Sequence, residues 1–123
     1  MKKTSSRVGL PALHPRFRIS CGKEIAFGPG KADLLELIME TGSIGRAAAR
    51  MGMSYMRAWL LIQAMNRCFK QPVIATAHGG RERGGAQVTE TGRRLLELYR
   101  RMEKKGMKSI QPEWRELQKF LRD

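Results

Sequence analysis

Residues 42–69 read GSIGRAAARMGMSYMRAWLLIQAMNRCF, and the spacing of small and capping residues in this segment decides the fold. Gly42 and Gly52 suit the left-handed backbone that ends a helix, because glycine has no Cβ to clash. Ser43 and Ser54 come soon after them, and a serine hydroxyl can accept hydrogen bonds from the free N–H groups of the next helix. The segment therefore predicts a helix-turn-helix, with a short first helix and a longer second helix.

Apolar residues at helical spacing give the expected buried faces of these two helices. In the short helix they are Ile44, Ala47, Ala48 and Met51. In the long helix they are Ala58, Leu61 or Ile62, Met65 and Phe69. The small alanines let the helices cross closely, and Met53 is expected to fill the corner between them.

A further helix is predicted before this segment, over about residues 31–41. Leu34, Leu37 and Ile38 have helical spacing, and Pro29 suits a first turn. Asp33 is expected to complement the dipole at the helix N-terminus. Residues 17–27 alternate weakly in polarity, which indicates one strand or a short ribbon, and residues 1–16 are expected to form a mobile basic arm.

After Pro72 the pattern changes to strands at 73–77 and 86–89, joined by a loop rich in glycine and arginine. This order predicts a β-hairpin with a long tip. Thr89 or Thr91 then caps a helix that we expect Gly106 to interrupt, and residues 113–121 predict a short amphipathic helix. The expected fold is mainly α with a small β-hairpin, a winged helix-turn-helix with a long C-terminal dimerisation helix. The expected units are an arm at 1–16, the domain at 17–107 and a helical tail at 108–123.

The last long helix carries an apolar stripe that exceeds the needs of one small domain. The stripe consists of Leu95, Leu98, Tyr99 and Met102. We interpret it as a two-fold dimer contact that sets the spacing of two half-sites. The alternative is the packed final helix of a monomer.

Charge points to a polyanionic partner. The chain has 24 Lys and Arg against 11 Asp and Glu, a net charge of +13. Between Glu40 and Glu82 there is no acidic residue, although this window holds six basic residues. A surface that faces phosphates has a reason to exclude carboxylates, because each would be repelled. The alternative is an ordinary solvated surface.

A helix-turn-helix places the N-terminal end of its second helix in the major groove of DNA, and a hairpin wing can contact the backbone or the minor groove. The candidate DNA-binding residues of the helices are Ser43, Arg46, Ser54, Tyr55, Arg57, Gln63 and Arg67. Those of the hairpin are Gly80, Arg81 and Arg83. An exposed, solvated turn is the alternative for the hairpin, and packing is favoured for Trp59.

Other functional classes find little support in the sequence. His14, Cys21, Cys68 and His78 lack metal-binding spacing, and no nucleophile, base and acid form a catalytic motif, so we expect neither a cofactor nor an enzyme. No membrane span or signal peptide is present, which predicts a cytoplasmic protein. Two alternatives to a sequence-specific regulator stay open. One is a nonspecific nucleic-acid-binding protein of the nucleoid-associated kind, and the other is an adaptor that uses Trp114 and Phe120.

Two stretches together resemble a known family. GSIGRAAARMGMSYMRAWLLIQAMNR and ATAHGGRERGGAQVTETGRRLLELY are similar to the N-terminal domain of the ModE family of molybdate-responsive transcriptional regulators, a relative of the LysR-type winged helix. The resemblance covers about residues 17–102. It is carried by Ser54-Tyr55 with Ala58-Trp59, by Met65-Asn66, and by the glycine-rich hairpin that leads into Thr89 and Gly92.

The resemblance implies a homodimer that binds double-stranded promoter DNA and acts on genes of molybdate uptake or molybdoenzymes. It also implies that the oxyanion is bound by a separate C-terminal pair of small β-barrel domains. Residues 103–123 read instead as a basic helical tail, so the resemblance leaves molybdate binding by these 123 residues open.

Overall fold

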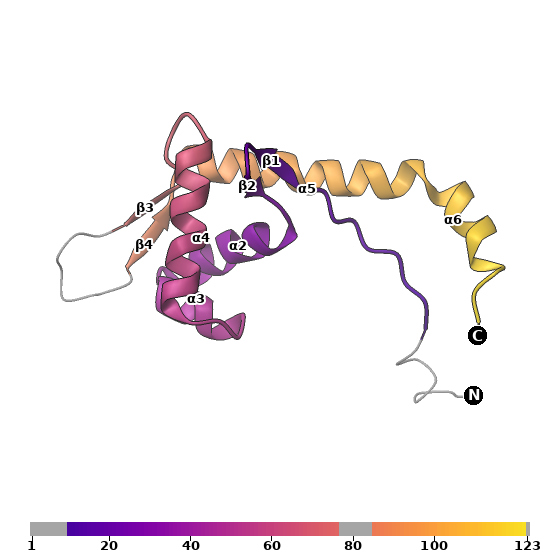
Figure 1. Ribbon diagram of the computed structural model, residues 1–123, viewed down its shortest axis with the longest axis horizontal. Helices are drawn as coiled ribbons and strands as arrows, with labels where there is room; N and C mark the ends of the chain where they lie inside the picture. Colours follow the sequence, from indigo (N-terminus) through magenta and orange to yellow (C-terminus); the bar gives the residue numbers. More distant parts are fainter. Residues whose placement is uncertain (1–9, 77–84, 123) are drawn as a thin grey trace.

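The chain forms a cluster of short elements from which one long helix projects (Figure 1). The structure, a computed structural model, describes residues 10–76 and 85–122. The elements in chain order are β1 (Ile19–Cys21), β2 (Glu24–Phe27), α2 (Pro29–Thr41), α3 (Ile44–Arg50), α4 (Tyr55–Cys68), β3 (Ile74–Thr76), β4 (Ala86–Val88), α5 (Glu90–Ser109) and α6 (Gln111–Gln118). The predicted winged helix-turn-helix is confirmed, with α3 and α4 as its two helices.

The turns of the helix-turn-helix form as the sequence predicts. Gly42 ends α2 with φ 68°, and Gly52 turns the chain between α3 and α4 with φ 70°, which is the left-handed region that glycine tolerates best. Ser43 caps α3 by accepting a hydrogen bond from the backbone N–H of Arg46 at 3.1 Å. Ser54 caps α4 in the same way through Arg57, also at 3.1 Å.

The predicted role of Asp33 is wrong. Helix α2 begins at Pro29, two residues earlier than expected, so Asp33 lies beyond the first turn, where the field of the N-terminus has faded. Its carboxylate instead accepts a hydrogen bond from Arg100 of α5 at 2.9 Å. Asp33 therefore joins two helices rather than capping one.

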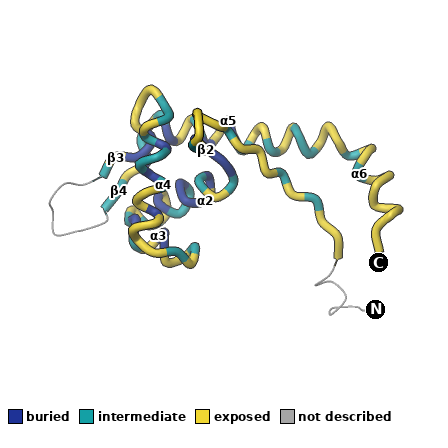
Figure 2. Tube along the Cα trace, in the orientation of Figure 1, coloured by how far each residue is buried: buried dark blue, intermediate teal, exposed yellow. Residues whose placement is uncertain are grey.

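One hydrophobic core holds the helices and both hairpins together. Ile38, Ile44, Ile62, Val88 and Tyr99 represent the elements that bury side chains in it. The ring of Phe27 packs edge-on against Tyr99, with centroids 5.0 Å apart. Figure 2 shows the buried residues concentrated where α2, α3 and α4 meet, whereas the far half of α5 and all of α6 are mostly exposed.

The two predicted β segments both form antiparallel hairpins. Residues 17–27 give the ribbon β1–β2, which turns at Gly22 with φ 65°. Strands β3 and β4 pair Ile74 with Val88, and Ser43 and Gly85 form an isolated bridge beside them. The end of β4 next to the tip is thus fixed against the junction of α2 and α3. Residues 77–84, the tip, lie outside the described residues.

The C-terminal helices differ from the prediction. Helix α5 continues through Gly106 to Ser109, because that glycine lies under the ring of Phe17 and leaves room for it. A Cβ at position 106 would stand 2.7 Å from Cζ of Phe17. Helix α6 then covers Gln111–Gln118 rather than 113–121, with Pro112 in its first turn.

Candidate nucleic-acid interface

Helix α4 turns one side to the core and the other to solvent. Ala58, Ile62 and Met65 are buried, as the sequence predicts. Tyr55 and Arg57 are exposed near the N-terminus, whereas Gln63 is half-buried farther along. Trp59, expected to pack, is 37% exposed, because it lies on the flank of the helix rather than on the stripe of Ala58 and Ile62.

The outward side of α4 is more apolar than expected. Met56 is 58% exposed and Leu60 is 54% exposed, and neither was predicted as a site residue. They lie four residues apart, hence on one side of the helix, and opposite the buried stripe. The sequence carries this signal, because a helical projection separates these two residues from Ala58 and Ile62.

Although the sequence between Glu40 and Glu82 holds no acidic residue, carboxylates from elsewhere in the chain reach the surface that this segment forms. Arg67, a predicted DNA-binding residue, donates from Nη2 to Oε1 of Glu24 at 3.0 Å and also from Nε to Oε2. This hydrogen-bonded carboxylate raises the pKa of Arg67. Likewise Arg50 pairs with Glu40 at 2.9 Å. Both carboxylates come from elements that precede the window in sequence, so Arg67 is a neutralised residue at the far end of α4.

Two other predicted cations keep their charge uncompensated. Arg46 at the start of α3 and Arg57 at the start of α4 are exposed, and neither forms an ion pair with any residue in the two described ranges. Each follows its capping serine by three residues. The serine oxygens of Ser43 and Ser54 are occupied as caps, but their O–H groups can still donate to a phosphate.

Asn66 fixes the hairpin relative to α4. Its amide oxygen accepts from the backbone N–H of Val73 at 2.8 Å and of Ile74 at 3.2 Å, and its amide nitrogen donates to the carbonyl of Ile74 at 3.0 Å. The side-chain amide therefore pairs with the backbone at the start of β3 as a neighbouring strand would. Asn66 thus positions the hairpin against α4. No motif or residue spacing in the sequence predicts this role.

The base of the wing is held from the other side by Thr89. Its hydroxyl accepts from the backbone N–H of Gly92 at 3.0 Å, which identifies Thr89 rather than Thr91 as the cap of α5, and it donates to the carbonyl of Pro72 at 2.6 Å. The predicted wing residues Gly80, Arg81 and Arg83 lie in the tip, outside the described residues.

The predicted dimer stripe divides into buried and exposed parts. Tyr99 is 2% exposed and donates its hydroxyl to the carbonyl of Phe17 at 2.6 Å, so it belongs to the core of its own chain. Leu98 and Met102 are 40% and 45% exposed, and Leu95 is half-buried. The sequence could not separate these residues, because a wide apolar stripe on one helix can face two partners.

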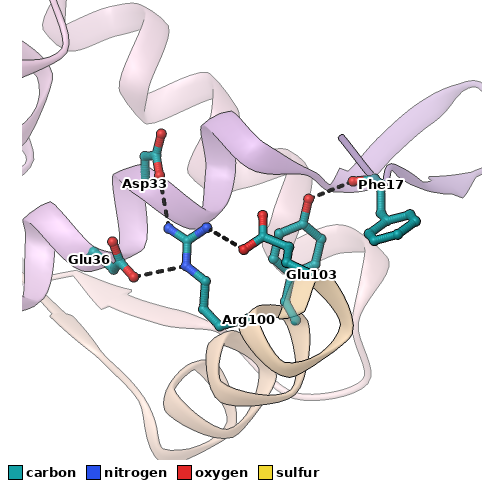
Figure 3. A network of polar contacts seen from close by, with 6 residues as sticks. Phe17, Asp33, Glu36, Arg100 and Glu103 are labelled. Atoms are coloured by element: carbon teal, nitrogen blue, oxygen red, sulfur yellow. Dashed lines mark hydrogen bonds and ion pairs between the residues drawn. The ribbon is translucent and has the colours of Figure 1, made fainter. Parts of the chain in front are cut away.

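Arg100 fixes the direction in which α5 leaves the core. Its guanidinium reaches Asp33 at 2.9 Å and Glu36 at 3.0 Å, both on α2, and Glu103 at 2.9 Å on its own helix (Figure 3). The hydrogen bond that Arg100 donates to Glu36 is the chief reason that the pKa of Arg100 is raised above its ordinary value. The network locks α5 to α2, so the exposed residues beyond Arg100 project in a defined direction.

A helix-turn-helix followed by a β-hairpin and a long helix defines a winged helix-turn-helix protein. Across the described ranges, no helix is long and apolar enough to span a membrane. Nor does that part of the chain gather three or more potential metal ligands.

Several known proteins similar to this chain carry the name ModE. Over 70 residues it is 44% identical to the molybdenum transport protein ModE of Azotobacter vinelandii, covering 57% of this chain and 26% of that protein. It is 41% identical over 71 residues to the transcriptional regulator ModE of Yersinia pestis. It is 39% identical over 71 residues to the DNA-binding transcriptional dual regulator ModE of Escherichia coli strain K12. Each of the latter two matches covers 58% of this chain and 27% of the relative.

The resemblance to the ModE family is therefore confirmed, and homologues of this chain are named transcriptional regulators. The match spans about a quarter of the length of these relatives. No family model matches the chain.

Proposed function

We propose that this chain is a DNA-binding transcriptional regulator that binds promoter DNA as a homodimer. The observation that carries the proposal is a pair of exposed cations, Arg46 and Arg57, that form no ion pair within residues 10–76 and 85–122. Each lies in the first turn of a helix of the helix-turn-helix, and its backbone N–H is bound by the capping serine. Two such helix starts present cations and backbone N–H groups on the side where phosphates of a duplex would lie.

In this proposal α4 enters the major groove. Ser54, Tyr55 and Arg57 lie at its N-terminal end, the end that contacts base edges in helix-turn-helix proteins, and Gln63 follows on the same helix. Ser43 and Arg46 of α3 contact the flanking backbone. Gly80, Arg81 and Arg83 of the wing contact sugar and phosphate or the minor groove. Arg67 contributes less to DNA binding, because its ion pair with Glu24 would have to break before it could contact a phosphate.

The exposed residues of α5 supply the homodimer contact. Leu98 and Met102 form the centre of this surface, with Leu95 at its edge, and Tyr99 is left out because it lies in the core. Apolar exposure continues along the chain at Ile110, Leu117 and Phe120. A second copy packed on this face would place two α4 helices in two half-sites, one helical turn of DNA or a multiple of it apart.

The names of the relatives suggest the regulated genes. They include molybdenum transport proteins, so we propose control of molybdate transport or molybdoenzyme genes. The alternative function is nonspecific binding in the manner of a nucleoid-associated protein. The same net charge of +13 would serve it.

Selection of bound duplexes from a random pool tests the proposal. A homodimeric regulator will enrich an inverted repeat, whereas a nonspecific binder will retain the pool without enrichment. Arg57→Gln should change the enriched sequence or abolish enrichment. Arg101→Gln, which removes an exposed cation from α5, serves as the matched control and should leave the enriched sequence unchanged.

A further inference from the structure

A pocket of about 340 Å³ lies beside the recognition helix, where three parts of the chain meet. Four cations line it: Arg16 and Arg18 from the segment before β1, Lys31 from the first turn of α2, and Arg57 from α4. The other lining residues are apolar or glycine, and no carboxylate is among them. Positive charge from segments distant in sequence is therefore concentrated around one hollow.

These four cations differ from most others near the core. Arg50, Arg67 and Arg100 are neutralised by carboxylates at about 3 Å. Within residues 10–76 and 85–122, none of the four pocket cations forms an ion pair. The like charges that line this pocket repel one another, which is unfavourable. An anion bound there would attract these cations and offset that repulsion.

The side chain of Arg18 and the start of α2 shape one side of the pocket. The stem of Arg18 runs close to Gly28, where even a Cβ would stand 3.3 Å from its Cγ. Helix α2 starts at this point without a side-chain cap, which leaves the N–H groups of its first turn directed toward the pocket end of the helix. Partial burial lowers the pKa of Lys31, and the charge of Arg57 acts in the same direction, whereas Cys68 and Glu24 act against them. A bound anion would oppose both effects on Lys31.

We propose that this pocket is a binding site for a phosphate group, and that in the DNA complex the group is a backbone phosphate beside the groove that α4 enters. The assignment to DNA rests on the proposed function. Arg57 connects the two, because it lines the pocket and lies at the N-terminal end of α4. The contact would extend the footprint of the protein to the β1–β2 side of α4, opposite the wing.

A phosphate in this pocket has two possible sources, the DNA backbone or a free phosphate compound, and two measurements distinguish them. The first is the slope of log Kd against log salt concentration for a random-sequence duplex. Lys31→Gln and Arg18→Gln should each reduce the slope, by about 0.9 for one lost phosphate contact. Arg101→Gln removes an equal charge outside the pocket and should leave the slope unchanged.

The second measurement is the unfolding midpoint in inorganic phosphate against chloride at equal ionic strength. Phosphate should raise the midpoint of the wild-type chain and of Arg101→Gln by more than that of Lys31→Gln, which keeps only the general stabilisation by this salt. Circular dichroism of each variant in chloride checks that it folds.

A reduced slope supports the DNA backbone as the source. An unchanged slope with a reduced phosphate effect supports the same pocket with a free phosphate compound as its ligand. Variants that match the control in both measurements overturn the proposal. Wild-type protein that binds no duplex would refute the proposed function, while the phosphate measurement would still test the pocket.

Discussion

At the scale of single residues, Gly92 shows why a small residue stands where the wing meets α5. Its backbone N–H is bound by the hydroxyl of Thr89, and its Cα faces the carbonyl of Val73 and the side chain of Val88. A Cβ at position 92 would stand 2.7 Å from Cγ1 of Val88 and even closer to the carbonyl oxygen of Val73. Thr89 and Gly92 therefore act as one joint between β3, β4 and the long helix.

Gly92→Ala should destabilise the fold by about 1–3 kcal/mol, because backbone rather than a flexible side chain must move. Gly45→Ala in α3 is the matched control. Its new Cβ would meet only Oγ of Ser43 at 3.7 Å, and alanine favours a helix over glycine by up to about 1 kcal/mol. Urea unfolding of both variants measures the difference. Equal stability of Gly92→Ala and the wild type would show that the contact of Gly92 with Val73 and Val88 leaves room for a Cβ.

Tyr99 predicts a loss of stability at alkaline pH. Burial raises the pKa of its phenol above the ordinary value of 10.0, so the folded chain favours the protonated form. The resulting stabilisation is complete below pH 10.0 and is lost as pH rises through the raised pKa. Tyr99→Phe should cost about 0.5–1.5 kcal/mol near neutral pH through the lost bond to Phe17. As pH rises above 10.0, Tyr99→Phe should also lose less stability than the wild type, because it has no phenol to ionise.

Unfolding free energies across a pH series check this prediction. Tyr55→Phe is the control, because that hydroxyl is on an exposed residue, and it should follow the wild-type curve. An alkaline slope that is the same in Tyr99→Phe and in the wild type would contradict the assignment to Tyr99.

At the scale of elements, the outward side of α4 predicts how bases are read. Met56 and Leu60 offer methyl and methylene groups to the groove, and the thymine methyl is the apolar group that the major groove presents. Replacing thymine by uracil in the selected duplex removes only that methyl group. Affinity should fall at one or more positions in each half-site for the wild-type chain.

The double variant Met56→Ala with Leu60→Ala supplies the complementary test. It should lose most of this sensitivity to uracil while it keeps its affinity for random duplex, because its cations are unchanged. An operator whose affinity is the same with uracil at every thymine would contradict this account of α4.

Helix and turn positions could be predicted from the sequence because their signals are local. Gly42, Ser43, Gly52 and Ser54 determine their own backbone geometry and that of the next residue or turn. The partners of charges could not be predicted, because they depend on packing between distant segments. Arg67 meets Glu24 across 43 positions of the chain, and Asp33 meets Arg100 across 67.

The candidate site was also predictable only where its features are local in sequence. The caps and the exposed Arg46 and Arg57 follow from local patterns, whereas the pocket beside α4 requires Arg16 and Arg18 to meet Lys31 and Arg57 in space. The extension of α5 through Gly106 is also nonlocal, because it depends on Phe17 lying over that glycine.

At the scale of the whole molecule, the projecting α5 predicts a dimer. Leu98→Glu together with Met102→Glu should convert it to a monomer, because two carboxylates per chain would be buried in the contact. Lys104→Glu, at an exposed position on the opposite side of the same helix, should remain dimeric. Sedimentation at micromolar concentration measures all three proteins. A monomeric wild-type chain would refute the dimer.

Sequence-specific DNA binding is the central claim, and the ratio of two affinities tests it most directly. The measurement compares Kd for the inverted repeat recovered by selection with Kd for a scrambled duplex of equal length and composition, at physiological salt. A regulator should favour the inverted repeat by about a thousandfold or more. Equal affinity for the two duplexes would contradict the account and identify a nonspecific nucleic-acid-binding protein.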